Sequence, residues 1–158
     1  MLLYLMRHGE AVASAVTDRD RQLTETGRTN NLATASALSE RKPDISHALC
    51  SPYIRAQETA ADLGSVIPGL DFQQVEFLTP DTPTNVFFDS VDNYCELQQV
   101  AALLLVGHNP LLSNALSVLM GGTQDRARHL DTSNLVCLNV EVLAPACAEL
   151  KYWIRPEA

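Results

Sequence analysis

The sequence is poor in cationic side chains. Its 158 residues include 11 lysines and arginines against 19 aspartates and glutamates, which gives a formal net charge of -8 and an isoelectric point of about 4.8. Broad binding to nucleic acid or to anionic membranes favours a basic surface, so we expect neither as a partner. A local site for an anionic substrate is not excluded, because a few arginines can form one on an acidic protein.

Metal-ligand patterns and long hydrophobic runs are also lacking. The four cysteines and four histidines form no CxxC, HExxH or paired Cys/His spacing, so we expect reduced thiols, no metal site and no cofactor. No run approaches the ~20 apolar residues of a membrane helix, and the apolar start at residues 2–6 is too short for a secretory leader. We therefore expect a cytoplasmic protein.

Strands and helices are predicted to alternate along most of the chain. Short apolar runs predict strands at residues 2–6, 47–50, 102–106, 135–142 and 148–154, with a weaker candidate at 73–77. Capping and helix-start signals predict helices at residues 24–40, 52–63, 84–99 and 110–120. The alternation predicts an α/β three-layer sandwich, with a mainly parallel central sheet and helices on both faces. The length suits a single domain, residues 1–158.

Two of these helices have distinct start signals. Thr24 is a suitable N-cap for the first helix. Ser51 and Pro52 predict the start of the second helix, with the serine as N-cap and the proline at the first helical position. Gly64 is predicted to end that second helix.

Two arginines and two histidines follow the predicted strands. Arg7 and His8 come directly after the first strand, and Arg55 lies near the start of the helix after the second. His108 lies between a later strand and its helix. Ligands of open α/β sheets bind at the carboxyl ends of the strands, and helix N-termini attract phosphate. The topology therefore predicts that these four side chains meet at one end of the sheet.

These residue types suit phosphoryl transfer. A neutral imidazole can attack phosphorus and carry the phosphoryl group as a covalent intermediate. Arginine holds phosphoryl oxygens through its fixed charge and bidentate geometry. A second imidazolium can donate to a phosphoryl oxygen in the transition state. The set therefore contains a candidate nucleophile and candidate donors for the phosphoryl oxygens.

Four segments occur together in an order that resembles a known family. They read MRHGE at residues 6–10, LTETG at 23–27, SPYIRAQET at 51–59 and VGHNP at 106–110. Together they resemble the histidine phosphatase superfamily, the group that includes the phosphoglycerate mutases. The short chain and the Leu-Thr-Pro segment at 78–80 resemble its SixA-type phosphohistidine phosphatases in particular.

The resemblance implies a phosphoglycerate mutase-like fold and a role for each residue. It implies that His8 is the nucleophile and that Arg7, Arg55 and His108 bind the phosphoryl group. Arg21 lies just before the Leu-Thr pair, where the family often has a basic residue. We therefore expect Arg21 to be a further phosphate or substrate contact.

One departure from the family pattern concerns the general acid. Larger members supply a carboxylic acid from the segment after the second helix, to protonate an alkoxide leaving group. Here that segment offers only Glu76 and Asp81, in no pattern typical of the family. Phosphohistidine needs less help, because its P–N bond is labile and imidazole leaves readily. The sequence therefore favours a monomeric phosphohistidine phosphatase that acts on a protein, such as a histidine-phosphotransfer domain.

Two other functions remain open at this point. A small-molecule phosphomonoesterase of the same superfamily would use Asp81 or Glu76 as its acid, and a non-catalytic module would only bind phosphohistidine. His47 and His129 belong to no motif and are expected to be structural or surface residues. The basic cluster at residues 126–129 is expected to be a surface loop, with docking of an acidic partner as the alternative.

Overall fold

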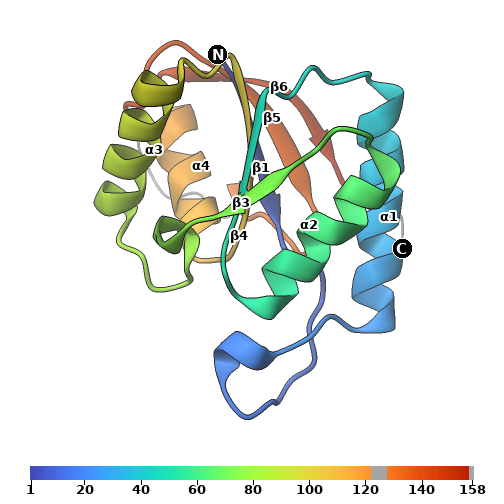
Figure 1. Ribbon diagram of the computed structural model, residues 1–158. Helices are drawn as coiled ribbons and strands as arrows, with labels where there is room; N and C mark the ends of the chain where they lie inside the picture. Colours follow the sequence, from blue (N-terminus) through green and yellow to red (C-terminus); the bar gives the residue numbers. More distant parts are fainter. Residues whose placement is uncertain (122–127, 157–158) are drawn as a thin grey trace.

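Six strands form one sheet in the order β3-β2-β4-β1-β5-β6 (Figure 1). Their bounds in chain order are β1 Leu2–Arg7, β2 His47–Cys50, β3 Phe72–Gln74, β4 Ala102–Gly107, β5 Leu135–Val140 and β6 Ala148–Ile154. The computed structural model describes residues 1–121 and 128–156. Strands β1 to β4 run parallel, β5 is antiparallel to β1, and β6 is antiparallel to β5. The prediction of a mainly parallel sheet is therefore confirmed.

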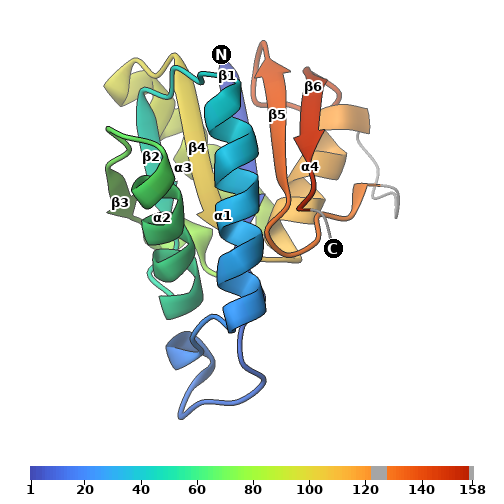
Figure 2. The ribbon, with the colours of Figure 1, turned by 90° about the vertical axis from the view of Figure 1, so that its right-hand side faces the viewer.

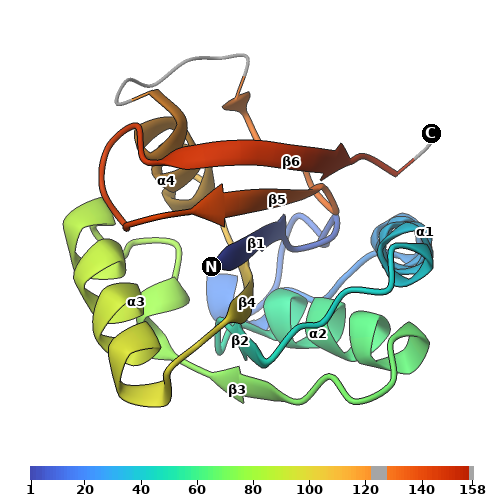
Figure 3. The same cartoon turned by 90° about the horizontal axis from the view of Figure 1, so that it is seen from above.

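Four helices cover the two faces of the sheet, which confirms the predicted three-layer sandwich (Figure 3). One face carries α1 and α2, and the other carries α3 and α4. The bounds are α1 Glu25–Glu40, α2 Ile54–Val66, α3 Thr84–Gln98 and α4 Leu111–Gly121. Among the described residues, single turns of 3-10 helix include η1 Asp18–Asp20 and η2 Glu76–Leu78. No helix in the described ranges has both the length and the apolar character needed to cross a bilayer.

The central strands are apolar throughout because both of their faces are covered by helices. Leu3 and Leu5 pack on the side of α3 and α4, whereas Tyr4 and Met6 pack on the side of α1 and α2. Successive side chains of a strand point to opposite faces, so a strand between two helical layers needs apolar residues at every position. This explains the uninterrupted runs in β1 and β4.

The predicted start and end of the second helix are wrong. Helix α2 begins at Ile54, with Tyr53 in the N-cap position, and it continues through Gly64 to Val66. Ser51 does not cap the helix: its Oγ accepts the backbone N–H of Tyr53 at 3.2 Å and lies 2.7 Å from His108 Nε2. Ser51 therefore contacts His108, a tertiary partner, and does not serve as the N-cap that local sequence preference predicted.

Two strand predictions were too long. Strand β3 covers only Phe72–Gln74, because the chain turns into η2 immediately afterwards. Strand β5 ends at Val140, where the loop to β6 begins. The other predicted elements agree with the structure to within about two residues, which is the usual uncertainty of element ends.

Candidate active site

The four side chains predicted to meet lie at the carboxyl ends of β1, β2 and β4. His8 follows β1, Arg55 is in the first turn of α2, and His108 follows β4. The ring centroids of His8 and His108 are 4.9 Å apart, and Arg55 Nε donates to His8 Nε2 at 3.2 Å. Arg7, the last residue of β1, is close enough for its charge to act on both histidines. The loop after β1 folds across this end of the sheet, below the start of α2 in Figure 1.

The hydrogen bonds of His8 define its tautomer. Nδ1 lies 2.7 Å from the carbonyl oxygen of Gly9, which can only accept, so Nδ1 carries the hydrogen. Nε2 then has a lone pair, and it accepts the Nε–H of Arg55. The nitrogen that faces Arg55 is therefore the one with a free lone pair, as a nucleophile requires.

Both active-site histidines are held in the neutral form. Burial lowers the pKa of His8 to about 3, and the guanidinium groups of Arg55 and Arg7 act in the same direction. Burial likewise lowers the pKa of His108 to about 2, with His8 and the same two arginines contributing. The expectation that this second ring is an imidazolium is therefore wrong, because burial beside positive charges keeps it neutral. His8 is consequently a neutral, unprotonated imidazole at physiological pH without the aid of a separate base.

These pKa shifts predict acid-sensitive folding. Unfolded histidine has a pKa of 6.5. Below that pH, His8 and His108 are protonated in the unfolded chain but remain neutral in the folded protein. We expect the free energy of unfolding of the ligand-free protein to fall as the pH is lowered from 6.5 to about 4, by about 1.4 kcal/mol per pH unit for each histidine. Urea denaturation at a series of pH values measures this slope.

Three variants test the origin of the slope. His8→Asn and His108→Asn should each flatten it, whereas His129→Asn, at an exposed position, should leave it unchanged. Asp18, whose pKa the Arg21 side chain lowers from 3.8, loses its charge only below this window. A wild-type stability that stays constant between pH 6.5 and 4 would contradict the assignment of neutral buried imidazoles.

Asp18 of η1 holds the guanidinium of Arg55. Arg55 Nη1 donates to the Asp18 backbone carbonyl at 2.7 Å, and Nη2 pairs with its carboxylate at 3.1 Å. The Asp18 carboxylate is half-exposed, whereas Arg55 is buried. Glu58, which lies one turn further along α2, pairs instead with Arg28 of α1 at 2.9 Å. The Arg55 side chain therefore contacts His8 and Asp18 in the site and does not form a surface ion pair within its own helix.

The site contains two buried nitrogen atoms that have no hydrogen-bond partner among the described residues, Arg7 Nε and His108 Nδ1. Ser51 Oγ accepts the Tyr53 N–H, so its hydroxyl hydrogen is available to His108 Nε2, which leaves the ring hydrogen of His108 on Nδ1. Buried donors without a partner are costly in free energy. An oxyanion would satisfy both donors, so the site is suited to receive one.

The predicted motifs pack against one another around His8. A Cβ atom on Gly27 would lie 2.2 Å from the Glu10 carbonyl oxygen, so only glycine lets α1 approach the loop after β1. Thr24 caps α1, as predicted, by accepting the Gly27 N–H at 3.0 Å, and its hydroxyl donates to the Glu10 carboxylate at 2.7 Å. The Gly9 N–H donates to Thr59 Oγ1 of α2. The four segments are therefore one contiguous support for the site.

The other predicted residues lie around or away from this centre. Arg21 Nε donates to the Val12 carbonyl at 2.7 Å and Nη1 pairs with Asp18 at 2.9 Å, so Arg21 reaches Arg55 only through Asp18. Its contact with substrate stays a prediction. Glu76 pairs with Arg19 at 3.6 Å, and its side chain is 77% exposed. Asp81 is exposed in the loop before α3 and forms no hydrogen bond or ion pair within the described ranges.

His47, His129 and the described part of the basic cluster lie outside the site. His47 Nδ1 lies 3.0 Å from Ser46 Oγ, and the ring packs edge-on against Tyr94. His129 is exposed beside Asp131. In the basic cluster, Arg128 Nη1 donates to the Ser117 carbonyl, whereas residues 126 and 127 lie outside the described residues.

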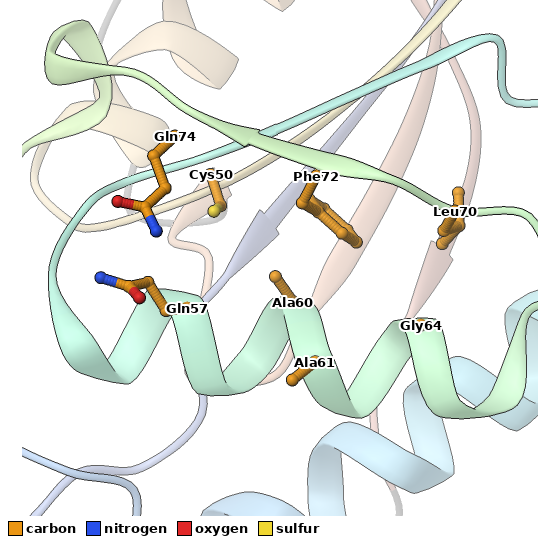
Figure 4. Close-up of a pocket in the computed structure, with 8 residues that line it drawn as sticks. All are labelled: Cys50, Gln57, Ala60, Ala61, Gly64, Leu70, Phe72 and Gln74. Carbon is orange, nitrogen blue, oxygen red and sulfur yellow. The ribbon is translucent and has the colours of Figure 1, made fainter.

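A separate hollow of about 290 Å³ lies between α2 and β3 (Figure 4). Gln57 and Gln74 point toward one another at one end, and the rest of the lining is apolar apart from the Cys50 sulfur. Burial raises the pKa of the Cys50 thiol to about 11, so this thiol stays protonated and unreactive. All four cysteines are unpaired, as expected. No group of three potential metal ligands occurs within residues 1–121 and 128–156.

Two residues of the site were not identified from the sequence. Ser51 was assigned to the helix, although it positions His108. Asp18 lies in an aperiodic loop, and its bond to Arg55 spans 37 residues. The sequence signal for Asp18 was its spacing from Arg21, three residues on, in a loop that precedes the helix start at Thr24.

Comparison with known proteins identifies the family of the chain. Residues 3–79 match the model of the histidine phosphatase superfamily (branch 1). The chain is similar to phosphohistidine phosphatase SixA of Escherichia coli (strain K12), with 28% identity over 130 residues, 77% of this chain and 76% of the relative. It is 30% identical over 132 residues to the phosphohistidine phosphatase SixA homolog of Haemophilus influenzae, which covers 77% of this chain and 78% of the relative.

Solved structures show the same fold. The structure of the protein histidine phosphatase SixA complexed with tungstate superposes with a TM-score of 0.86, at 24% identity, and covers 99% of this chain and 97% of that chain. Sequence and fold thus agree over most of the length. The chain belongs to the histidine phosphatase superfamily and is a phosphatase.

Proposed function

We propose that the protein removes phosphoryl groups from a histidine of another protein, such as a histidine-phosphotransfer domain, through a phospho-His8 intermediate. The observation that carries this proposal is the state of His8: a neutral ring, its hydrogen fixed on Nδ1 by Gly9, with the Nε2 lone pair among guanidinium groups. The two relatives named as phosphohistidine phosphatases support this substrate class.

In the first step, the Nε2 lone pair of His8 forms a bond to phosphorus while the P–N bond of the substrate breaks. The leaving imidazole takes the bonding electron pair and a proton from the medium. The incoming phosphoryl oxygens replace His8 Nε2 and the Asp18 carboxylate as acceptors for the Arg55 guanidinium. Arg7 Nε and the Nδ1–H of His108 provide two further donors, which stabilise the charge on the oxygens.

In the second step, water attacks phospho-His8. A water oxygen forms the new bond to phosphorus, the Nε2–P bond breaks, and the electron pair returns to Nε2. Water releases a proton to the medium and inorganic phosphate leaves. The same donors bind the phosphoryl oxygens in both steps, so one set of side chains stabilises both transition states.

The surroundings of the two candidate acids support phosphohistidine over phosphate esters. Protonation of an alkoxide leaving group needs an acid within hydrogen-bond reach of the reacting oxygen, and such an acid contributes about 10²–10⁴-fold in rate. Glu76 is largely exposed and paired with Arg19, and Asp81 is exposed in its loop. An imidazole leaving group does not require such an acid.

The substrate class is tested by kinetics on two kinds of substrate. We expect kcat/KM for a phosphorylated histidine-phosphotransfer domain to exceed that for small phosphomonoesters by about 100-fold or more, the share that an acid would supply. Asp81→Asn and Glu76→Gln should leave both rates unchanged. Comparable turnover of the monoesters, with a strong decrease in either variant, would show a small-molecule phosphomonoesterase.

The non-catalytic alternative has its own test. An enzyme releases many equivalents of inorganic phosphate from a phosphohistidine protein, and an alkaline quench traps label on wild-type protein. A binding module retains the phosphoprotein and releases none. Multiple turnovers by wild-type protein would exclude the module.

A further inference from the structure

A cavity at the opposite end of the sheet from His8 is lined by three cationic side chains. It has a volume of about 310 Å³ and lies beside α1, over β1, β5 and β6. Figure 2 shows the end of α1 and the start of β1 at the top and the loop that follows β1 at the bottom. Lys42 and Lys151, the two lysines of the sequence, both line this cavity together with Arg41, and the single carboxylate beside them is Asp44. The cavity is therefore locally cationic on a protein of net charge -8.

A β-bulge brings Lys151 to the cavity. Neighbouring residues of a regular strand point to opposite faces, so Lys151 and Tyr152 would not line the same space. The pairing of β5 with β6 skips Lys151, because Cys137 pairs with Tyr152 and the next residue of β5 pairs with Leu150. Bulges redirect a side chain, often beside functional sites. The bulge therefore explains why the side chains of Lys151 and Tyr152 both line the cavity.

A second backbone irregularity brings Lys42 there. Its φ of 49° lies in the left-handed region, directly after the last turn of α1. Glycine is favoured at this position after a helix, because a Cβ atom is strained there. Position 42 is nevertheless a lysine, although its backbone conformation favours glycine. Both lysines thus reach the cavity from exceptional backbone positions.

The inner wall of the cavity is aromatic and apolar. Tyr4 is buried, and its phenol, the Tyr152 phenol and the Cys137 thiol interact with one another. The Arg41 guanidinium lies 4.7 Å from the centre of the Tyr152 ring, with Nη1 donating to the Ala37 carbonyl, so the guanidinium is fixed over that ring. Leu2 and Pro43 complete the apolar lining. The cavity thus combines a wall for a ring with two cations for an anionic group.

We propose that this cavity binds a small aromatic carboxylate, with its ring among the partly exposed Leu2, Pro43 and Tyr152 and its carboxylate between Lys42 and Lys151. A volume of about 310 Å³ is at the lower end of the range of small-molecule sites, so the ligand is small. The site is independent of the catalytic function proposed above, because it shares no residue with the catalytic centre.

Titration calorimetry with 2-naphthoate tests the proposal. We expect measurable binding to wild-type protein, and binding at least about tenfold weaker for the uncharged 2-naphthamide, because a charge-assisted bond is lost. Lys151→Gln and Lys42→Gly should each weaken naphthoate binding by about tenfold. Lys42→Gly also relieves the left-handed strain, so this variant should fold at least as well as wild type, and its loss of binding cannot be due to unfolding.

Two control variants test whether the ligand binds in this cavity. Arg155→Gln removes a cation that lies over Trp153, outside the cavity, and should leave the affinity unchanged. His8→Asn should also bind naphthoate as wild type does, since the catalytic centre lies at the other end of the sheet. Absence of binding up to about 10 mM, a range in which even weak ligands are detected, would overturn the proposal. Equal affinity for the Lys42→Gly and Lys151→Gln variants, or loss of binding in His8→Asn, would overturn it as well.

Discussion

Replacement of His8 by alanine is expected to lower kcat on a phosphohistidine protein by about 10⁴-fold or more, the scale seen when a covalent nucleophile is removed. The variant loses the Nε2 lone pair, and no other side chain in the described part of the site offers an equivalent nucleophile beside Arg55. His108 cannot substitute for it, because its Nε2 lies against Ser51. The measurement is release of inorganic phosphate under multiple turnover.

The matched control is His129→Ala, which removes an exposed imidazole and should retain full activity. Labelled phosphate should be trapped on wild type and on this control, and not on His8→Ala. Thermal unfolding of all three proteins shows whether each is folded. Activity of a folded His8→Ala variant within about tenfold of wild type would assign the nucleophile to another residue.

Arg55→Lys is expected to lower kcat/KM by about 10²–10³-fold, the usual effect of removing one oxyanion donor. Lysine keeps the charge but has one nitrogen in place of the three planar nitrogens with which Arg55 reaches His8 and Asp18. We expect kcat to fall as well as kcat/KM, because the lost donors act mainly on the transition state.

Arg28→Lys is the matched control for this prediction. Arg28 links α1 to Glu58 and Asp62 of α2 at the surface, outside the catalytic centre, so its replacement should leave kcat unchanged. Inhibition by vanadate, an oxyanion that resembles the transition state, should weaken in Arg55→Lys and not in Arg28→Lys. Equal kcat in the two variants would remove Arg55 from the mechanism.

The architecture could be predicted from the sequence because its signals are local. Runs such as residues 2–6 and 102–106 are apolar at every position, which only a strand covered on both faces requires. Parallel strands end at the same edge of a sheet, so residues that follow such runs converge without further information. His8 and His108 were placed together by this argument, and the structure puts their rings in contact.

The parts that escaped prediction depend on contacts between distant segments. Ser51 before a proline has a strong local preference for an N-cap, and only the position of His108, 57 residues later, reverses it. Asp18 lies in a segment with no periodicity, and its partner Arg55 lies 37 residues later. Single-residue irregularities, such as the bulge at Lys151, leave no trace in a hydrophobic pattern.

The hydrogen bond from Arg55 to His8 Nε2 also bears on which species the resting enzyme admits. Two adjacent neutral imidazoles are ordinarily an attractive pair of ligands for zinc or copper. Here one lone pair already accepts from a guanidinium, and the positive charges of Arg55 and Arg7 repel an approaching cation. On the proposed mechanism, a phosphoryl dianion is attracted by the same charges and replaces His8 as the acceptor of the guanidinium donors, which frees the lone pair. The arrangement thus disfavours a metal cation and favours an anion at the proposed nucleophile.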